Sequence, residues 1–131
     1  MIQDPFRQGR RIARGRQAQQ GGLAAEAAAE AALGRDGWAI LARRIRTAAG
    51  EVDLVAEREG LVAFIEVKSR PTLADAAFAL GPRQRARLLA AAELLLAANP
   101  GWGRHGARFD VLLVDPEGRV RRIADAFRQE R

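Results

Sequence analysis

Apolar residues recur along the chain with two spacings, one typical of helices and one typical of strands. Leu23–Leu33 consists almost entirely of alanine, leucine and glutamate, which favour helices, and glycines flank it on both sides. Pro82–Ala98 has helical spacing, begins with a proline suited to a first turn and ends before Asn99-Pro100-Gly101. We therefore predict two helices, one in the first third of the chain and one in the second half.

Five shorter segments alternate apolar and polar residues or are continuously apolar, as half-buried and fully buried strands do. They are Trp38–Arg46, Val52–Ala56, Leu61–Val67, Phe109–Val114 and Val120–Ile123. The third is largely apolar on both faces, so we expect it at the centre of the sheet. The order of helix, three strands, helix and two strands predicts the α/β class, with a mixed central β-sheet flanked by helices.

The composition limits the classes to which this protein can belong. Its 131 residues, 48% of them apolar and 29% charged, suit one globular domain. The absence of cysteine excludes a disulfide scaffold and thiol catalysis, and one histidine, His105, is too few for a two-histidine metal site. No signal peptide or membrane-length apolar run is recognisable. We therefore expect a soluble, cytoplasmic protein with no membrane partner.

The net charge of +6 comes almost entirely from arginine, because Lys68 is the only lysine. Residues 1–20 carry arginines among glutamine and glycine, with few apolar residues to anchor them. This pattern predicts a flexible basic arm over residues 1–20, followed by one domain over residues 21–131. Such an arm attracts a polyanion through counterion release, and a solvated tail without a ligand is the open alternative.

Three charged residues on the predicted strands carry the chemistry. Glu66 and Lys68 are two positions apart, so they share one face of their strand, and a short turn folds Asp53 back beside Glu66. Two neighbouring carboxylates repel, and a hard divalent cation relieves that repulsion. Water bound to the cation loses its proton more easily, and an adjacent lysine can orient it. The pattern indicates phosphodiester hydrolysis, with a structural Glu66–Lys68 ion pair as the alternative.

Two segments of the chain resemble the signature of the YraN-like family of bacterial proteins. They are Gly50–Val55, with the sequence GEVDLV, and Phe64–Arg70, with the sequence FIEVKSR. That family is assigned to the PD-(D/E)XK superfamily of nucleases. The resemblance therefore implies a restriction-endonuclease-like core and a single nuclease-like domain.

The resemblance also implies a role for each matching residue. Asp53 and Glu66 are expected to hold Mg²⁺ or Mn²⁺ together with the main-chain carbonyl of Val67, and Lys68 is expected to be the catalytic lysine. Glu26 matches an acidic residue that faces the metal through water. The other interpretation of Glu26 is an exposed helix carboxylate near the helix amino terminus. Glu51 belongs to the signature without an assigned role.

Basic and polar residues near the signature are the expected phosphate contacts. Arg70 directly follows the motif, and Arg83 and Arg87 share one face of the second predicted helix. Solvated arginines are the alternative for the helix pair. Gln84 stands where the YraN-like family often has a lysine, and a glutamine there can still contact phosphate or the attacking water.

The leading hypothesis is a nuclease that uses Mg²⁺ or Mn²⁺ to hydrolyse DNA, with RNA and branched DNA as alternative substrates. A nucleic-acid-binding module with an idle nuclease-like site is the alternative from a different class. A domain of this size covers few base pairs, so a homodimer and a DNA-processing partner protein are the two partner hypotheses.

Overall fold

A computed structural model describes residues 12–74 and 80–123 of the chain. Its two helices and five strands occur in the order α1 (Ile12–Arg35), β1 (Ala39–Thr47), β2 (Gly50–Arg58), β3 (Leu61–Ser69), α2 (Pro82–Ala98), β4 (Ala107–Val114) and β5 (Val120–Ile123). This order confirms the predicted α/β class, and each strand lies within a few residues of its expected position.

The first helix is longer than predicted. It begins at Ile12, so its first turns belong to the segment that we expected to be a flexible arm. Residues 1–11 of that arm lie outside the described residues, and the division into arm and domain stays a prediction. Within the described ranges, no helix is both long enough and apolar enough to cross a bilayer.

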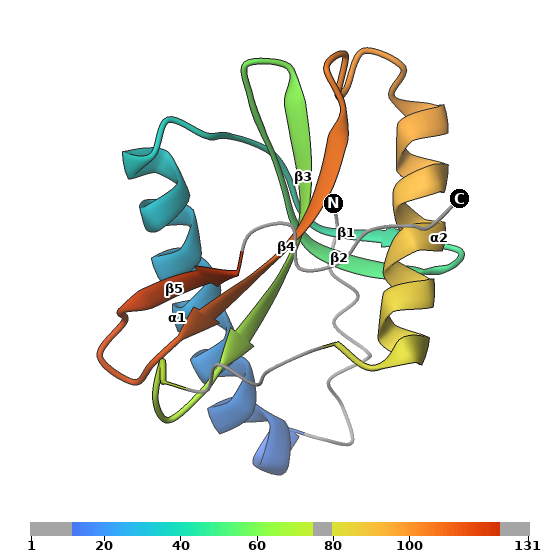
Figure 1. The fold of residues 1–131 in the computed structure, drawn as a ribbon. Helices are drawn as coiled ribbons and strands as arrows, with labels where there is room; N and C mark the ends of the chain where they lie inside the picture. The colour runs from blue at the N-terminus through green and yellow to red at the C-terminus, as the bar shows by residue number, and fades with distance from the viewer. Residues whose placement is uncertain (1–11, 75–79, 124–131) are drawn as a thin grey trace.

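The five strands form one mixed sheet in the order β1-β2-β3-β4-β5, which places β3 at the centre as predicted. Short turns make the β1–β2, β2–β3 and β4–β5 pairs antiparallel, and the crossover through α2 makes β3 and β4 parallel (Figure 1). The β2–β3 turn is formed by Glu59 and Gly60, whose φ angles of 54° and 81° suit a two-residue hairpin.

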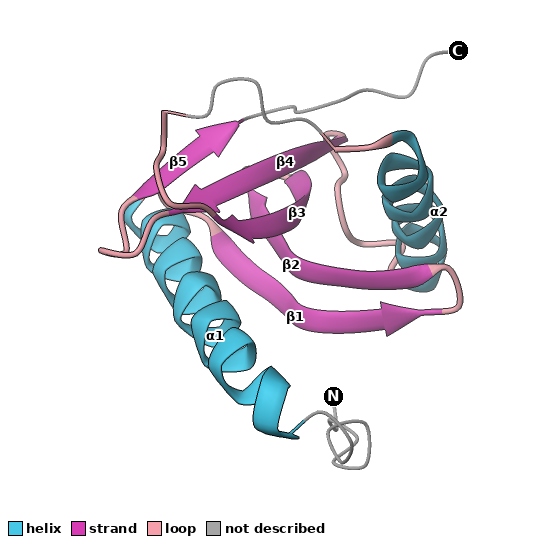
Figure 2. Ribbon diagram, turned by 90° about the horizontal axis from the view of Figure 1, so that it is seen from below, coloured by secondary structure: helices cyan, strands magenta, loops and turns pink. Residues whose placement is uncertain are grey.

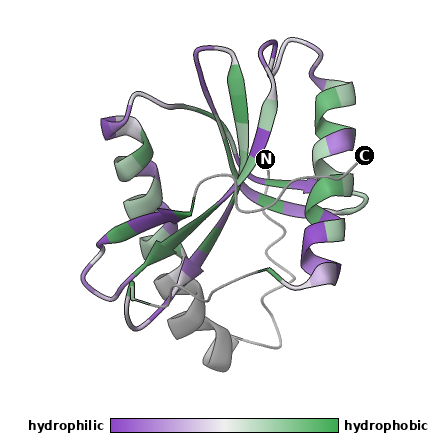
Figure 3. Ribbon diagram, in the orientation of Figure 1, coloured by the Kyte–Doolittle hydropathy of each residue, from purple (hydrophilic) through white to green (hydrophobic). Residues whose placement is uncertain are grey.

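The two helices pack on opposite faces of the sheet (Figure 2). Side chains alternate along β4, so Val111 and Leu113 contact the α2 layer while Leu112 and Val114 contact the α1 layer. Figure 3 shows apolar residues concentrated on the inner strands and on parts of both helices. Phe64, at the centre of β3, is fully buried. The sheet therefore has two cores, and the site must form where a strand leaves them.

A buried ionic network joins β4 and β5 on the α1 side. Asp110 is 0% exposed, and its carboxylate accepts hydrogen bonds from Arg108 Nε at 3.0 Å and Arg122 Nε at 2.8 Å. The guanidinium carbon of Arg122 lies 4.6 Å from the ring centroid of buried Trp38, a cation–π contact. Asp110 therefore links β4 to β5 through its ion pair with Arg122.

The side chains of β2 change the face of the sheet on which they lie near the middle of the strand. Val52 belongs to the core against α2, whereas Leu54, two residues further on, belongs to the core against α1. In a regular strand these two side chains would share a face. The partner strand β1 is irregular across from this stretch, since Arg44 has a φ of 48°. A register shift between Ile40 and Ala42 follows across from Ala56 and Val55. This bend separates the end of the β1–β2 hairpin from β3.

Candidate functional site

The candidate site lies at the fork where β2 and β3 part. Their antiparallel pairing ends at Leu54 and Ile65, after which β3 continues only beside β4. Asp53 and Glu66 are the first residues beyond this last pair, one on each strand. The backbone N–H of Val67 donates to Asp53 Oδ2 at 2.8 Å, which replaces a strand hydrogen bond that the fork removes. The Asp53 carboxylate is therefore held at the mouth of the fork.

Glu66 and Lys68 share one face of β3, as their spacing predicted, and that face is the one covered by α2. Lys68 Nζ is 3.0 Å from Glu66 Oε2, and the two side chains are 27% and 15% exposed. Gln84, in the first turn of α2, donates to the same oxygen from Nε2 at 2.6 Å. The helix therefore orients the Glu66 carboxylate from above the sheet while Lys68 holds it from within the strand.

The electrostatics at Asp53 are those of a buried carboxyl group beside a second carboxylate, Glu66, whose own cationic partner is Lys68. Burial raises the pKa of Asp53 most strongly, the negative charge of Glu66 raises it further, and together they bring it to about 8. The hydrogen bond from Val67 N–H acts in the opposite direction, and the more distant charge of Glu26 adds a smaller increase to the pKa. The site thus favours a positive group between its two carboxylates.

A cavity of about 230 Å³ opens beside these carboxylates. Its lining consists of Gly50, Glu51, Asp53, Glu66, Gln84, Arg87 and Leu88. The structure therefore brings both predicted metal carboxylates together with two of the predicted phosphate contacts, Gln84 and Arg87. It also adds Glu51, the signature residue without an assigned role, to the same cavity wall.

The donor set fits a hard divalent cation. Among the described residues, no group of three or more acidic, histidine or cysteine side chains is arranged to hold a metal. Magnesium commonly uses one or two carboxylates and keeps several waters, so the Asp53–Glu66 pair is sufficient for it. Burial and the charge of Glu66 raise the pKa of Asp53, and a cation between the two carboxylates would favour the ionised form of Asp53.

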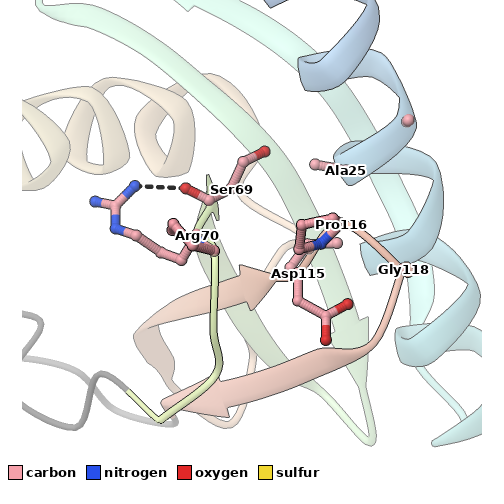
Figure 4. Close-up of a pocket in the computed structure, with 9 residues that line it drawn as sticks. Ala25, Ser69, Arg70, Asp115, Pro116 and Gly118 are labelled. Carbon is pink, nitrogen blue, oxygen red and sulfur yellow. Dashed lines mark hydrogen bonds between the residues drawn. The ribbon is translucent and has the colours of Figure 1, made fainter.

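Five predicted site residues do not line this cavity. Two of them, Val67 and Lys68, contact the carboxylates that do, through the hydrogen bond to Asp53 and the ion pair with Glu66. The other three, Glu26, Arg70 and Arg83, have other surroundings. Glu26 on α1 pairs with Arg44, whose Nε donates to Glu26 Oε1 at 2.9 Å. Arg83 is exposed in the first turn of α2. Arg70 donates from Nη1 to the Ser69 carbonyl at 2.7 Å and borders a different pocket, which lies between α1 and the β4–β5 turn (Figure 4).

Arg44 is the residue near the site that sequence reasoning missed. Nothing in the sequence distinguishes it from Arg43 and Arg46, because all three belong to one arginine-rich strand. Its pairing depends on a left-handed backbone at one position of β1 and on the distance from β1 to α1. Both are properties of the folded chain.

Without an added divalent cation, the protein is expected to lose stability through Asp53 as the pH rises from about 4 to about 8. In the unfolded chain this carboxyl ionises near pH 4, whereas its pKa in the fold is about 8. Between these values the folded state binds more protons, so the free energy of unfolding falls by at most about 1.4 kcal/mol per pH unit.

Chemical denaturation of the wild type and Asp53→Asn across this range measures the effect. The stability of the variant should depend less on pH, and its advantage over the wild type should grow toward pH 8. Parallel stability curves for the two proteins would contradict the assignment of a raised pKa to Asp53.

Comparison with known proteins identifies the family of the chain. The model of the uncharacterised protein family UPF0102 matches residues 25–114, which include the fork and its carboxylates. A UPF0102 protein of Granulibacter bethesdensis is 58% identical over 91% of this chain and 75% of its own length. UPF0102 proteins of Azorhizobium caulinodans and Rhodopseudomonas palustris are 50% and 49% identical, over 83% and 81% of this chain and 83% and 82% of their own lengths. The resemblance drawn from the signature is confirmed, and the chain belongs to the UPF0102 family, the YraN family.

Proposed function

We propose that this protein is a metal-dependent nuclease that hydrolyses phosphodiester bonds of DNA, on a restriction-endonuclease-like core. One observation carries the proposal: Asp53 and Glu66, from different strands, meet at the fork of the sheet beside a cavity, and Lys68 pairs with Glu66 at 3.0 Å. Two carboxylates with one lysine form a donor set for a cation and a charged group for the reacting water.

The carbonyl of Val67 and the carboxylates of Asp53 and Glu66 are the groups that would hold Mg²⁺ or Mn²⁺. When bound, such a cation supplies a more acidic water and neutralises charge on the phosphate. The N–H of Val67 orients Asp53, and Gln84 orients Glu66, so both carboxylates are positioned before any ligand arrives. This preorganisation lowers the reorganisation that the reaction requires.

Lys68 is the group that we assign to the attacking water and to the developing negative charge. Its Nζ already lies within hydrogen-bond distance of Glu66, so a water beside that carboxylate is within its reach. Arg87 on the cavity wall offers a guanidinium to a backbone phosphate. Arg70 and Arg83, further from the fork, extend the proposed phosphate contacts without reading sequence.

A panel of labelled linear, nicked, flapped and four-way-junction DNA, with a matching RNA, tests the proposal. The protein is incubated with each substrate in Mg²⁺, in Mn²⁺ and in a chelator. We expect cleavage of at least one DNA only when the metal is present. Salt-dependent binding of these substrates without cleavage under any metal would favour the alternative, a nucleic-acid-binding module with an idle site.

A further inference from the structure

An ion pair between α1 and β1 lies next to the candidate metal site. Arg44 Nε and Glu26 Oε1 are 2.9 Å apart, and their side chains are only 27% and 18% exposed. Arg44 lies opposite Asp53, because the flanking residues Arg43 and Ile45 pair with Leu54 and Val52 of β2. The ion pair therefore starts from the position of β1 that lies across from Asp53.

The backbone at Arg44 is bent in a way that serves this contact. Consecutive side chains of a regular strand point to opposite faces. Arg43 and Arg44 nevertheless both contact α1, since Arg43 Nε is 2.8 Å from Glu30 Oε2 while Arg44 holds Glu26. The φ of 48° at Arg44 is a left-handed value that residues other than glycine adopt rarely. The fold thus retains a disfavoured backbone conformation at the residue that neutralises Glu26.

Glu26 is close enough to the site to affect it and yet does not line the cavity. Its charge contributes to the raised pKa of Asp53, whereas the cavity wall contains Glu51, Asp53 and Glu66 instead. A third free carboxylate at this position would attract divalent cations more strongly, and carboxylate-rich sites hold two metals. The ion pair with Arg44 occupies the Glu26 carboxylate, and the guanidinium adds a positive charge that repels a cation.

We infer that Arg44 withholds Glu26 from the candidate metal site, so that the site binds one divalent cation through Asp53 and Glu66. This inference rests on the proposed function, because it concerns the cation that the nuclease would use. It assigns Arg44 as a positioning residue that sets the cation stoichiometry and affinity. It also assigns Glu26 to an ion pair instead of to metal coordination.

Calorimetric titration of the full chain with Mn²⁺ tests the inference. The variant Arg44→Asn removes the charge and places a residue that tolerates a left-handed backbone at this position. Arg43→Asn is the matched control, because it breaks the neighbouring ion pair, in which Arg43 is 62% exposed. We expect one Mn²⁺ per wild-type chain, the same result for Arg43→Asn, and roughly tenfold tighter binding or a second Mn²⁺ in Arg44→Asn.

Further variants keep the test decisive. Adding Glu26→Gln to Arg44→Asn should return Mn²⁺ affinity to about the wild-type value, because the released carboxylate is gone. Arg44→Gly, which fits the left-handed backbone without strain, replaces Arg44→Asn if that variant does not fold. Unchanged or weaker Mn²⁺ binding in the neutral variants, with the wild type binding normally, overturns the inference and leaves the proposed function standing. A folded wild type that binds no Mn²⁺ overturns both.

Discussion

Replacing Lys68 by alanine is expected to lower metal-dependent cleavage by about 10²- to 10⁴-fold, the usual contribution of a group that transfers or orients a proton. The reason is geometric: the ammonium lies 3.0 Å from Oε2 of Glu66, a carboxylate that lines the cavity where the water and the phosphate would meet. Mn²⁺ affinity should stay the same or rise, because the substitution removes a cation and frees Glu66. A loss of cleavage without a loss of metal binding separates a catalytic role from a structural one.

Two further variants distinguish the possible causes of that loss of cleavage. Lys68→Arg keeps the positive charge but cannot release a proton near neutral pH, so partial activity would indicate charge stabilisation and no activity would indicate proton transfer. Asp53→Ala should remove cleavage together with Mn²⁺ binding, since it deletes a proposed ligand. Initial rates on the cleaved substrate measure all three variants.

The control for the Lys68 experiment is Arg85→Ala. Arg85 is an exposed cation in the first turns of α2 that does not line the cavity, so its loss should change the rate only slightly. Cleavage that persists in both Asp53→Ala and Lys68→Ala, with each variant folded, would reject the proposed mechanism.

The second large effect concerns stability. Replacing Asp110 by asparagine is expected to lower the free energy of unfolding by about 3 kcal/mol, because it removes the negative partner of two arginines at a buried position. Asp110 is 0% exposed, whereas Arg108 and Arg122 are 22% and 23% exposed, so part of their charge stays accessible to water. The magnitude is therefore near the lower end for a broken buried pair. Urea denaturation of the purified variant measures it.

Glu30→Gln provides the comparison for this prediction. It breaks the exposed Arg43–Glu30 pair, whose loss should cost less than about 1 kcal/mol. The folded Asp110→Asn protein should still bind Mn²⁺ with the wild-type affinity, since Asp110 lies on the α1 side of the sheet and does not line the cavity. Equal stability of the two variants would show that the network around Asp110 does not hold the β4–β5 edge.

The sequence alone predicted the fold class and the order of the elements. A helix buries one side when its apolar residues recur about every 3.6 positions, and a strand does so when they recur every two. The apolar pattern around Leu88 therefore predicts a helix, and the pattern around Phe64 predicts a strand. The shared face of Glu66 and Lys68 followed from the same period. The signature in Gly50–Val55 and Phe64–Arg70 also pointed to the family that the family model confirms.

Tertiary structure decided how the site is assembled. The bend near Asp53, the fork beyond Leu54 and the approach of Gln84 to Glu66 depend on how β2, β3 and α2 pack, which no local pattern records. The ion pair between Glu26 and Arg44 depends on the left-handed backbone at Arg44, which the sequence does not distinguish from the neighbouring arginines. Periodicity places a side chain on a face of its own element, whereas contacts between elements are set by packing across the whole sheet. The sequence therefore determined which residues are candidates for the chemistry, and the packing of the sheet determined which of them meet.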